Sequence, residues 1–152
     1  MGPSRSVVLR PNDRLTVADL NAAMNDTDSR WMRHALALAA RAEREDDEVP
    51  VGALIVDAAG DLLAEGWNRN ICDHDPSAHA EIVAMRQAGM RRLARVVYGA
   101  SDPKTGAAGS VFDLLADPRH NHRIEVLGGV LAEEAGARLV AYFRARRGKR
   151  LR

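Results

Sequence analysis

The sequence predicts a single layered α/β domain, on three observations. A length of 152 residues suits one domain with its own core. The composition, 46% hydrophobic and 28% charged, is typical of a folded globular protein. Helical and strand patterns follow one another in the order helix, hairpin, helix, strand, helix, strand, helix, which favours helices layered on a sheet.

The first half of the chain predicts a helix followed by a hairpin. Residues 1–28 carry little pattern and are expected to form a flexible N-terminal extension, with a loop at the Asn/Asp cluster 25–28. Apolar residues recur at helical spacing over 29–45. Two strand patterns, 51–57 and 62–67, flank a turn at 58–61, so they predict a β-hairpin.

The stretch around which the chain is organised runs from Asp75 to Gly89 and predicts a short helix. Ser77 is expected to be its N-cap, and Gly89 is expected to end it. His79 and Glu81 then lie in the first turn, where the helix dipole stabilises a carboxylate and favours a neutral imidazole. Those two groups suit a metal site with an adjacent general base. An ordinary capped helix with a polar first turn explains the same residues.

The second half predicts two more strands, 96–98 and 124–127, a short helix at 110–116 and a closing helix at 130–147. The closing helix is expected to bury Val130, Leu131, Ala135, Leu139, Val140 and Phe143. Six of the nine residues in the tail 144–152 are Arg or Lys. Such a tail suits a phosphate backbone, although a solvated chain end has the same composition.

Charge and composition exclude some classes of protein. The net charge is only +1, so the overall balance points to no particular partner. We expect a cytoplasmic protein without membrane contact, because no apolar run reaches spanning length and the start lacks a signal-peptide core. The single cysteine, Cys72, excludes an intramolecular disulfide and a Cys-x-x-Cys metal pair.

Several motifs in order resemble those of the zinc-dependent cytidine deaminase superfamily, and most closely the bacterial tRNA adenosine deaminases. They include Val49-Pro-Val-Gly-Ala53, Gly66-Trp-Asn-Arg69, His74-Asp-Pro-Ser-Ala-His-Ala-Glu81 and Asp102-Pro-Lys-Thr-Gly-Ala-Ala-Gly-Ser110. The resemblance implies a three-layer α/β/α fold with a mixed sheet over residues 29–152. It also implies a homodimer that binds a tRNA anticodon stem-loop and converts adenosine to inosine with a zinc-activated water.

The resemblance also implies roles for single residues. His79 resembles the histidine ligand of the zinc ion, and Glu81 resembles the carboxylate that moves protons. Asn68 resembles an asparagine that contacts the base. Asp102, Lys104 and Thr105 lie in the loop that would border the RNA strand.

One departure from the family is severe, because the Pro-Cys-x-x-Cys motif with the other two zinc ligands is absent. The chain passes from Gly89 almost directly to the strand near Arg95. The missing piece would hold an inner strand and the start of a helix, roughly two to three dozen residues. Its loss is expected to open the sheet, and a catalytic zinc ion normally needs three protein ligands. Cys72 and His74 with His79, or His120 and His122 elsewhere, are the residues that could substitute.

Three functions follow as alternatives. The first is a tRNA wobble-adenosine deaminase lineage, inactive in this chain because the Cys ligands are absent. The second is a non-catalytic RNA-binding or dimerisation partner. The third is a deaminase of a free nucleobase or nucleoside, which the wobble-deaminase character of residues 102–110 disfavours.

Overall fold

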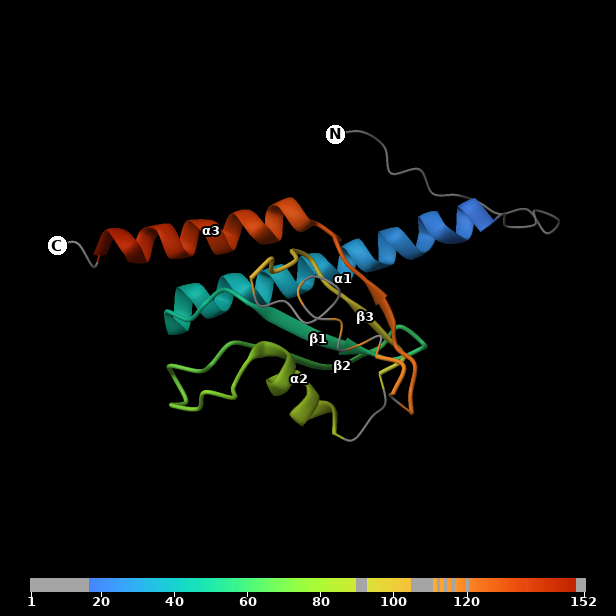
Figure 1. The fold of residues 1–152 in the computed structure, drawn as a ribbon, viewed down its shortest axis with the longest axis horizontal. Helices are drawn as coiled ribbons and strands as arrows, with labels where there is room; N and C mark the ends of the chain where they lie inside the picture. The colour runs from blue at the N-terminus through green and yellow to red at the C-terminus, as the bar shows by residue number, and fades with distance from the viewer. Residues whose placement is uncertain are drawn as a thin grey trace.

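The computed structural model describes residues 17–89, 93–104, 111, 113, 115, 117–119 and 121–149, with the backbone alone for 17–24 and 149. In these described residues the elements follow one another in the order α1 Val17–Asp46, β1 Gly52–Val56, β2 Leu62–Trp67, α2 Ala80–Ala88, β3 Arg95–Val97, β4 Glu125–Leu127 and α3 Ala132–Lys149 (Figure 1). No helix in this described part is long and apolar enough to cross a membrane.

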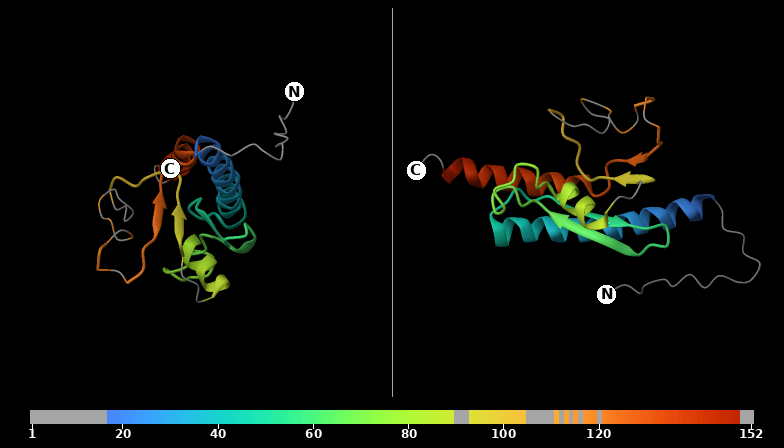
Figure 2. Two further views of the ribbon diagram at one scale, coloured as in Figure 1. Left: turned by 90° about the vertical axis from the view of Figure 1, so that its right-hand side faces the viewer. Right: turned by 90° about the horizontal axis from the view of Figure 1, so that it is seen from below.

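The predicted hairpin is confirmed and forms the middle of a three-layer arrangement. β1 and β2 pair antiparallel, with Gly52 opposite Trp67 and Ala53 opposite Gly66. Helix α1 covers one face and α2 the other (Figure 2). Both helices approach at a glycine. A Cβ on Gly52 would lie 2.1 Å from the carbonyl oxygen of Ala35 in α1, and one on Gly66 would lie 2.6 Å from that of Ala80 in α2.

The strands form two separate sheets within the described residues. β1 pairs with β2, and β3 pairs with β4 in parallel, with Val96 opposite Val126. The predicted α/β class is therefore confirmed, and the expected mixed sheet is interrupted between the hairpin and β3. This is the region of the chain where the sequence predicts the loss of an inner strand.

The loop predicted at residues 25–28 is wrong, because α1 is helical throughout this stretch. Asp28 explains the difference. The residue is 7% exposed, and its two carboxylate oxygens accept hydrogen bonds of 2.6 and 2.8 Å from the guanidinium of Arg95 in β3. A paired, buried carboxylate stabilises the helix where local preference favours a turn. The helix thus crosses the boundary predicted at residue 28.

Helix α3 packs along the end of α1 but leaves part of its apolar surface exposed. Tyr142 is buried, and its hydroxyl donates to the carbonyl of Asp47 at 3.1 Å. The side chains of Val140 and Phe143, expected in the core, are instead 53% and 46% exposed. The helix predicted at 110–116 is also wrong at its described residues, since 111, 113 and 115 are not helical.

The start of α2 is fixed by Asn68, at the end of β2, and not by Ser77. The helix begins at Ala80, with His79 as an N-cap whose side chain makes no capping bond. The N–H of Ala80 donates to Oδ1 of Asn68 at 2.9 Å, in a buried position. Ser77 instead donates from its hydroxyl to Asp75 at 2.6 Å, which stabilises the turn before the helix. The predicted end of the helix at Gly89 is confirmed.

The approach of β1 to α1 predicts a large effect of one added methyl group. Gly52→Ala should lower the free energy of unfolding by about 1–3 kcal/mol, because the new Cβ overlaps backbone atoms of α1. Gly148→Ala is the matched control: a Cβ there meets nothing within 4 Å, so stability should hold or rise by about 0.5–1 kcal/mol. Urea denaturation measures both, and equal effects would contradict the packing described.

The cap on α2 predicts that Asn68→Ala lowers the free energy of unfolding by about 1–2 kcal/mol, because a buried N–H loses its acceptor. Asn68→Asp keeps an acceptor oxygen in place and should cost less. The same denaturation experiment compares the two variants with the wild-type chain. An alanine variant as stable as the wild type would show that Ala80 finds another partner.

Candidate functional site

Three of the predicted site residues lie together where β2 ends and α2 begins. His79 and Glu81 are both exposed, at the N-cap and in the first turn of α2. The backbone carbonyl of His79 accepts from Val83 at 2.9 Å, so this residue is joined to the helix although its ring is free to face outward. Asn68 is directly beside them through its bond to Ala80.

Asn68, which resembles a base-contacting asparagine, is buried in this chain. Its side chain is 4% exposed, and its amide oxygen accepts the bond from Ala80. Its own N–H donates to the carbonyl of Val51 at 3.2 Å, which extends the pairing of the hairpin by one residue. Asn68 therefore links the hairpin to the helix that carries His79 and Glu81.

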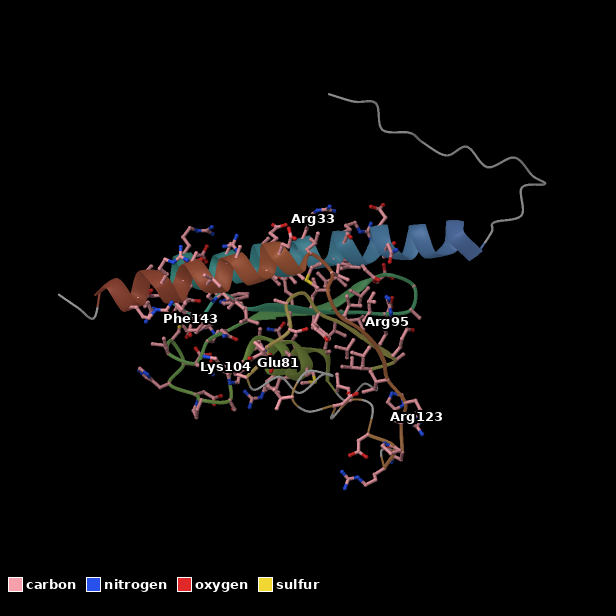
Figure 3. The ribbon with its side chains drawn as sticks, turned by 45° about the horizontal axis from the view of Figure 1, so that its top comes forward. Arg33, Glu81, Arg95, Lys104, Arg123 and Phe143 are labelled. Atoms are coloured by element: carbon pink, nitrogen blue, oxygen red, sulfur yellow. The ribbon has the colours of Figure 1, made fainter. Side chains whose placement is uncertain are left out.

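The loop after β3 supplies two further predicted residues. Asp102 and Lys104 are exposed there, and Figure 3 shows Lys104 in this loop and Glu81 on α2. The backbone N–H of Lys104 donates to Oδ1 of Asp102 at 2.8 Å, which makes a turn and leaves the ammonium group at the surface. Thr105 lies outside the described residues.

The donor groups that the structure describes do not fit a zinc ion. No group of three or more His, Cys, Asp and Glu side chains that could hold a metal occurs in the described part of the chain. Desolvation raises the pKa of the exposed Cys72 thiol, which disfavours the thiolate that zinc requires. Of the other histidines, His122 contacts the carbonyl of Leu93 at 2.6 Å, and His120 lies outside the described residues. The substitute site of Cys72, His74 and His79 is therefore not formed.

Glu48 is a positioning residue that the sequence did not reveal. It is 1% exposed, and its carboxylate accepts from the N–H groups of Ile71 and Cys72 at 2.6 and 3.0 Å. These bonds hold the loop that leads to α2. Glu48 ends an acidic run, which is typical of a solvated helix end. The apolar Val49-Pro50 directly after it was the available signal that the chain turns inward here.

An open pocket of about 370 Å³ lies between the end of β2, the following loop and α2, but neither His79 nor Glu81 lines it. Its charges are paired. Arg69 contacts Asp73 at 2.8 Å, and Arg86 contacts Asp75 at 3.3 Å. Hydrogen bonds from Arg69 lower the pKa of Asp73, and hydrogen bonds from Ser77 lower that of Asp75, so both carboxylates stay ionised. The pocket is lined by Trp67, Arg69, Asp73, Asp75, Ala78, Val83, Arg86 and Gln87.

Comparison with known proteins agrees with the motifs. Residues 25–103 match the family profile of the cytidine and deoxycytidylate deaminase zinc-binding region. A tRNA-specific adenosine deaminase of Haemophilus influenzae is 39% identical over 157 positions, covering 85% of this chain and 90% of that protein. Its counterpart in Bacillus subtilis is 33% identical, covering 81% and 92%.

A solved structure has the same fold. It comes from work on A-to-I editing by tRNA:A34 deaminases at the wobble position of transfer RNA, and it aligns with a TM-score of 0.63 at 31% identity. The alignment covers 73% of this chain and 99% of the other.

The sequence alignments also measure what this chain lacks. With the Haemophilus protein, 85% of 152 residues fills about 129 of the 157 positions, so about 28 positions have no residue in this chain, enough for a strand, a helix and their connections. The Bacillus alignment leaves the same shortfall of about 28 positions, since 81% of the chain fills about 123 of 151. The deficit agrees with the two to three dozen residues predicted from the sequence. The chain belongs to the cytidine and deoxycytidylate deaminase family, in the lineage of the tRNA-specific adenosine deaminases.

Proposed function

We propose that this chain binds the anticodon arm of tRNA and, by itself, does not deaminate the wobble adenosine. One observation carries the proposal. The chain keeps the Asn68, His79 and Glu81 arrangement at the start of α2, yet has a single cysteine and no cluster of metal ligands among its described residues. Hydrolytic deamination in this family depends on zinc, and the residues present do not fit it.

Exposed cations support the RNA-binding part of the proposal. Lys104 lies in the loop after β3, and Arg144 and Arg147 lie on α3 with exposed side chains. Arg146, between them, is half-buried and pairs with Asp47 at 2.6 Å, so it contributes less free charge. Contacts between such cations and phosphates release counterions, which gives affinity without sequence preference. By their resemblance to the family, Asp102 and Thr105 border the proposed RNA strand, whereas the buried Asn68 acts by holding the start of α2.

The proposal includes a homodimer and a cytoplasmic location, as the resemblance implies. Relatives that match four-fifths or more of the chain are named for tRNA. Their names therefore favour an RNA substrate for the lineage over a free nucleobase or nucleoside. An unpaired anticodon loop also suits a family that acts on bases turned out of the stack.

The proposal predicts that the purified chain binds an anticodon stem-loop with an affinity that falls steeply with salt, and forms no inosine. Arg144→Ala with Arg147→Ala should weaken binding and reduce the slope of log Kd against log salt by about 1 for each phosphate that the variant no longer neutralises. Arg119→Ala is the matched control, because its guanidinium is already paired with Asp117. If the chain does not bind the stem-loop at low salt, the proposal that it binds RNA is wrong. If the chain forms inosine and Glu81→Ala abolishes that activity, the proposal that it is inactive is wrong.

A further inference from the structure

We propose that the free edges of β1 and β3 form an acceptor for one extended strand supplied by a separate polypeptide. The occupant is a strand-forming segment that corresponds to the positions, about 28 in each alignment, that the relatives fill and this chain does not. The inference rests on the proposed function, because it treats the chain as an incomplete member of the deaminase lineage.

The free edge of β1 follows from its pairing with β2. The N–H of Asn68 donates to the carbonyl of Val51, so the backbone N–H and C=O groups of Val51 point towards β2. Because the direction of the backbone groups alternates along an antiparallel strand, Ala53 also faces β2, while Gly52 and Leu54 face away. In the described part of the chain, β1 has no other strand as a partner.

The free edge of β3 follows from its pairing with β4. The N–H of Glu125 donates to the carbonyl of Ala94, and the N–H of Tyr98 donates to that of Leu127. The backbone N–H and C=O groups that point towards β4 are therefore those of residues 94, 96 and 98. The backbone groups of Arg95 and Val97 point to the other edge. Both views in Figure 2 place β3 between β4 and the hairpin, so this edge faces the side on which β1 lies.

Helix α1 holds the two edges in place without the missing strand. It packs on β1 at Gly52, and it binds β3 through the pair of hydrogen bonds from Arg95 to Asp28. A Cβ on Gly99, directly after β3, would lie 3.6 Å from the sulfur of Met32 in α1. The acceptor is thus organised before the strand arrives, which lowers the entropic cost of binding.

The sequence of β1 is that of an inner strand. Charged residues and prolines usually protect an edge strand from further pairing. Gly52–Val56 contains neither, so its composition is that of an inner strand. Each of its residues is only half-buried. An apolar strand that leaves backbone donors and acceptors free is a site for β-strand addition. A second copy of these 152 residues has the same shortfall, so the proposal assigns the strand to a separate polypeptide.

The test uses the full chain and a synthetic peptide. The peptide has the sequence of the Haemophilus relative at the aligned positions that this chain does not fill. Binding and amide hydrogen exchange are measured in EDTA, without metal. The peptide should bind and protect the amides of Gly52, Leu54, Arg95 and Val97. A peptide with its cysteines replaced by serine should bind equally well, because strand pairing needs no thiolate. With zinc, only the cysteine peptide should raise the metal bound per chain.

Two variants test the edge itself. Leu54→Pro removes a donor at the free edge of β1 and should weaken peptide binding about tenfold or more, whereas Leu54→Val should not. Should Leu54→Pro fail to fold, a peptide with N-methylated amides along the pairing edge, added to the wild-type chain, should bind as weakly. Absence of binding and protection with the unmodified peptide would overturn the inference. Edge protection that appears without peptide and rises with protein concentration would also overturn it, by assigning the edges to a second copy.

The inference and the proposed function fail differently. RNA binding by the isolated chain without peptide binding would overturn the acceptor and leave the proposed function in place. Peptide binding with edge protection, but no RNA binding, would overturn the proposed function and leave the acceptor. A chain with the same segment inserted after Gly89 is the positive control for zinc binding and inosine formation.

Discussion

The buried hydrogen bond from the N–H of Ala80 to Asn68 is the interaction on which the site depends. It joins the end of the hairpin to the start of α2, and so places His79 and Glu81 at the edge of the layered core. Close packing at Gly66 brings the same helix against β2. Glu48 adds a third restraint, because its buried carboxylate holds the loop between them. The polar start of α2 is thus fixed by contacts that need no metal.

The second half of the fold depends on α1. An ion pair from Asp28 to Arg95 joins β3 to this helix, and one from Glu43 to Arg138 joins α3 to it. The bond from Tyr142 to Asp47, directly after the end of α1, adds a further link to α3. The two sheets are therefore held side by side although no described strand joins them. This explains how a chain short by about 28 positions keeps the layered arrangement of its family. Among the described strands, β1 and β3 each keep an edge without a partner strand.

Local sequence patterns correctly predicted the hairpin, the end of α2 at Gly89 and the strands near 96 and 125. They failed where contacts between residues distant in sequence determine the local structure. Asp28 is helical because of Arg95, 67 residues away, and the polar cluster around it favours a loop by composition. Ser77 is a residue type that favours the N-cap, but its hydroxyl donates to Asp75. Asn68 instead accepts the hydrogen bond from the first N–H of α2. Glu48 belongs to an acidic run that gives no sign of burial. The absence of a Cys-x-x-Cys motif, in contrast, follows directly from the single cysteine. The alignments leave about 28 positions unfilled, which lies within the range predicted from the sequence.

Among the described residues, the start of α2 lacks the partners to hold zinc. The most direct test is the zinc content of the purified chain, measured after expression in zinc-supplemented medium and exchange into metal-free buffer. The account predicts a content near zero, unchanged by His79→Ala or Cys72→Ser. About one zinc ion per chain, lost in either variant, would contradict it and would assign the metal to a ligand set formed around His79.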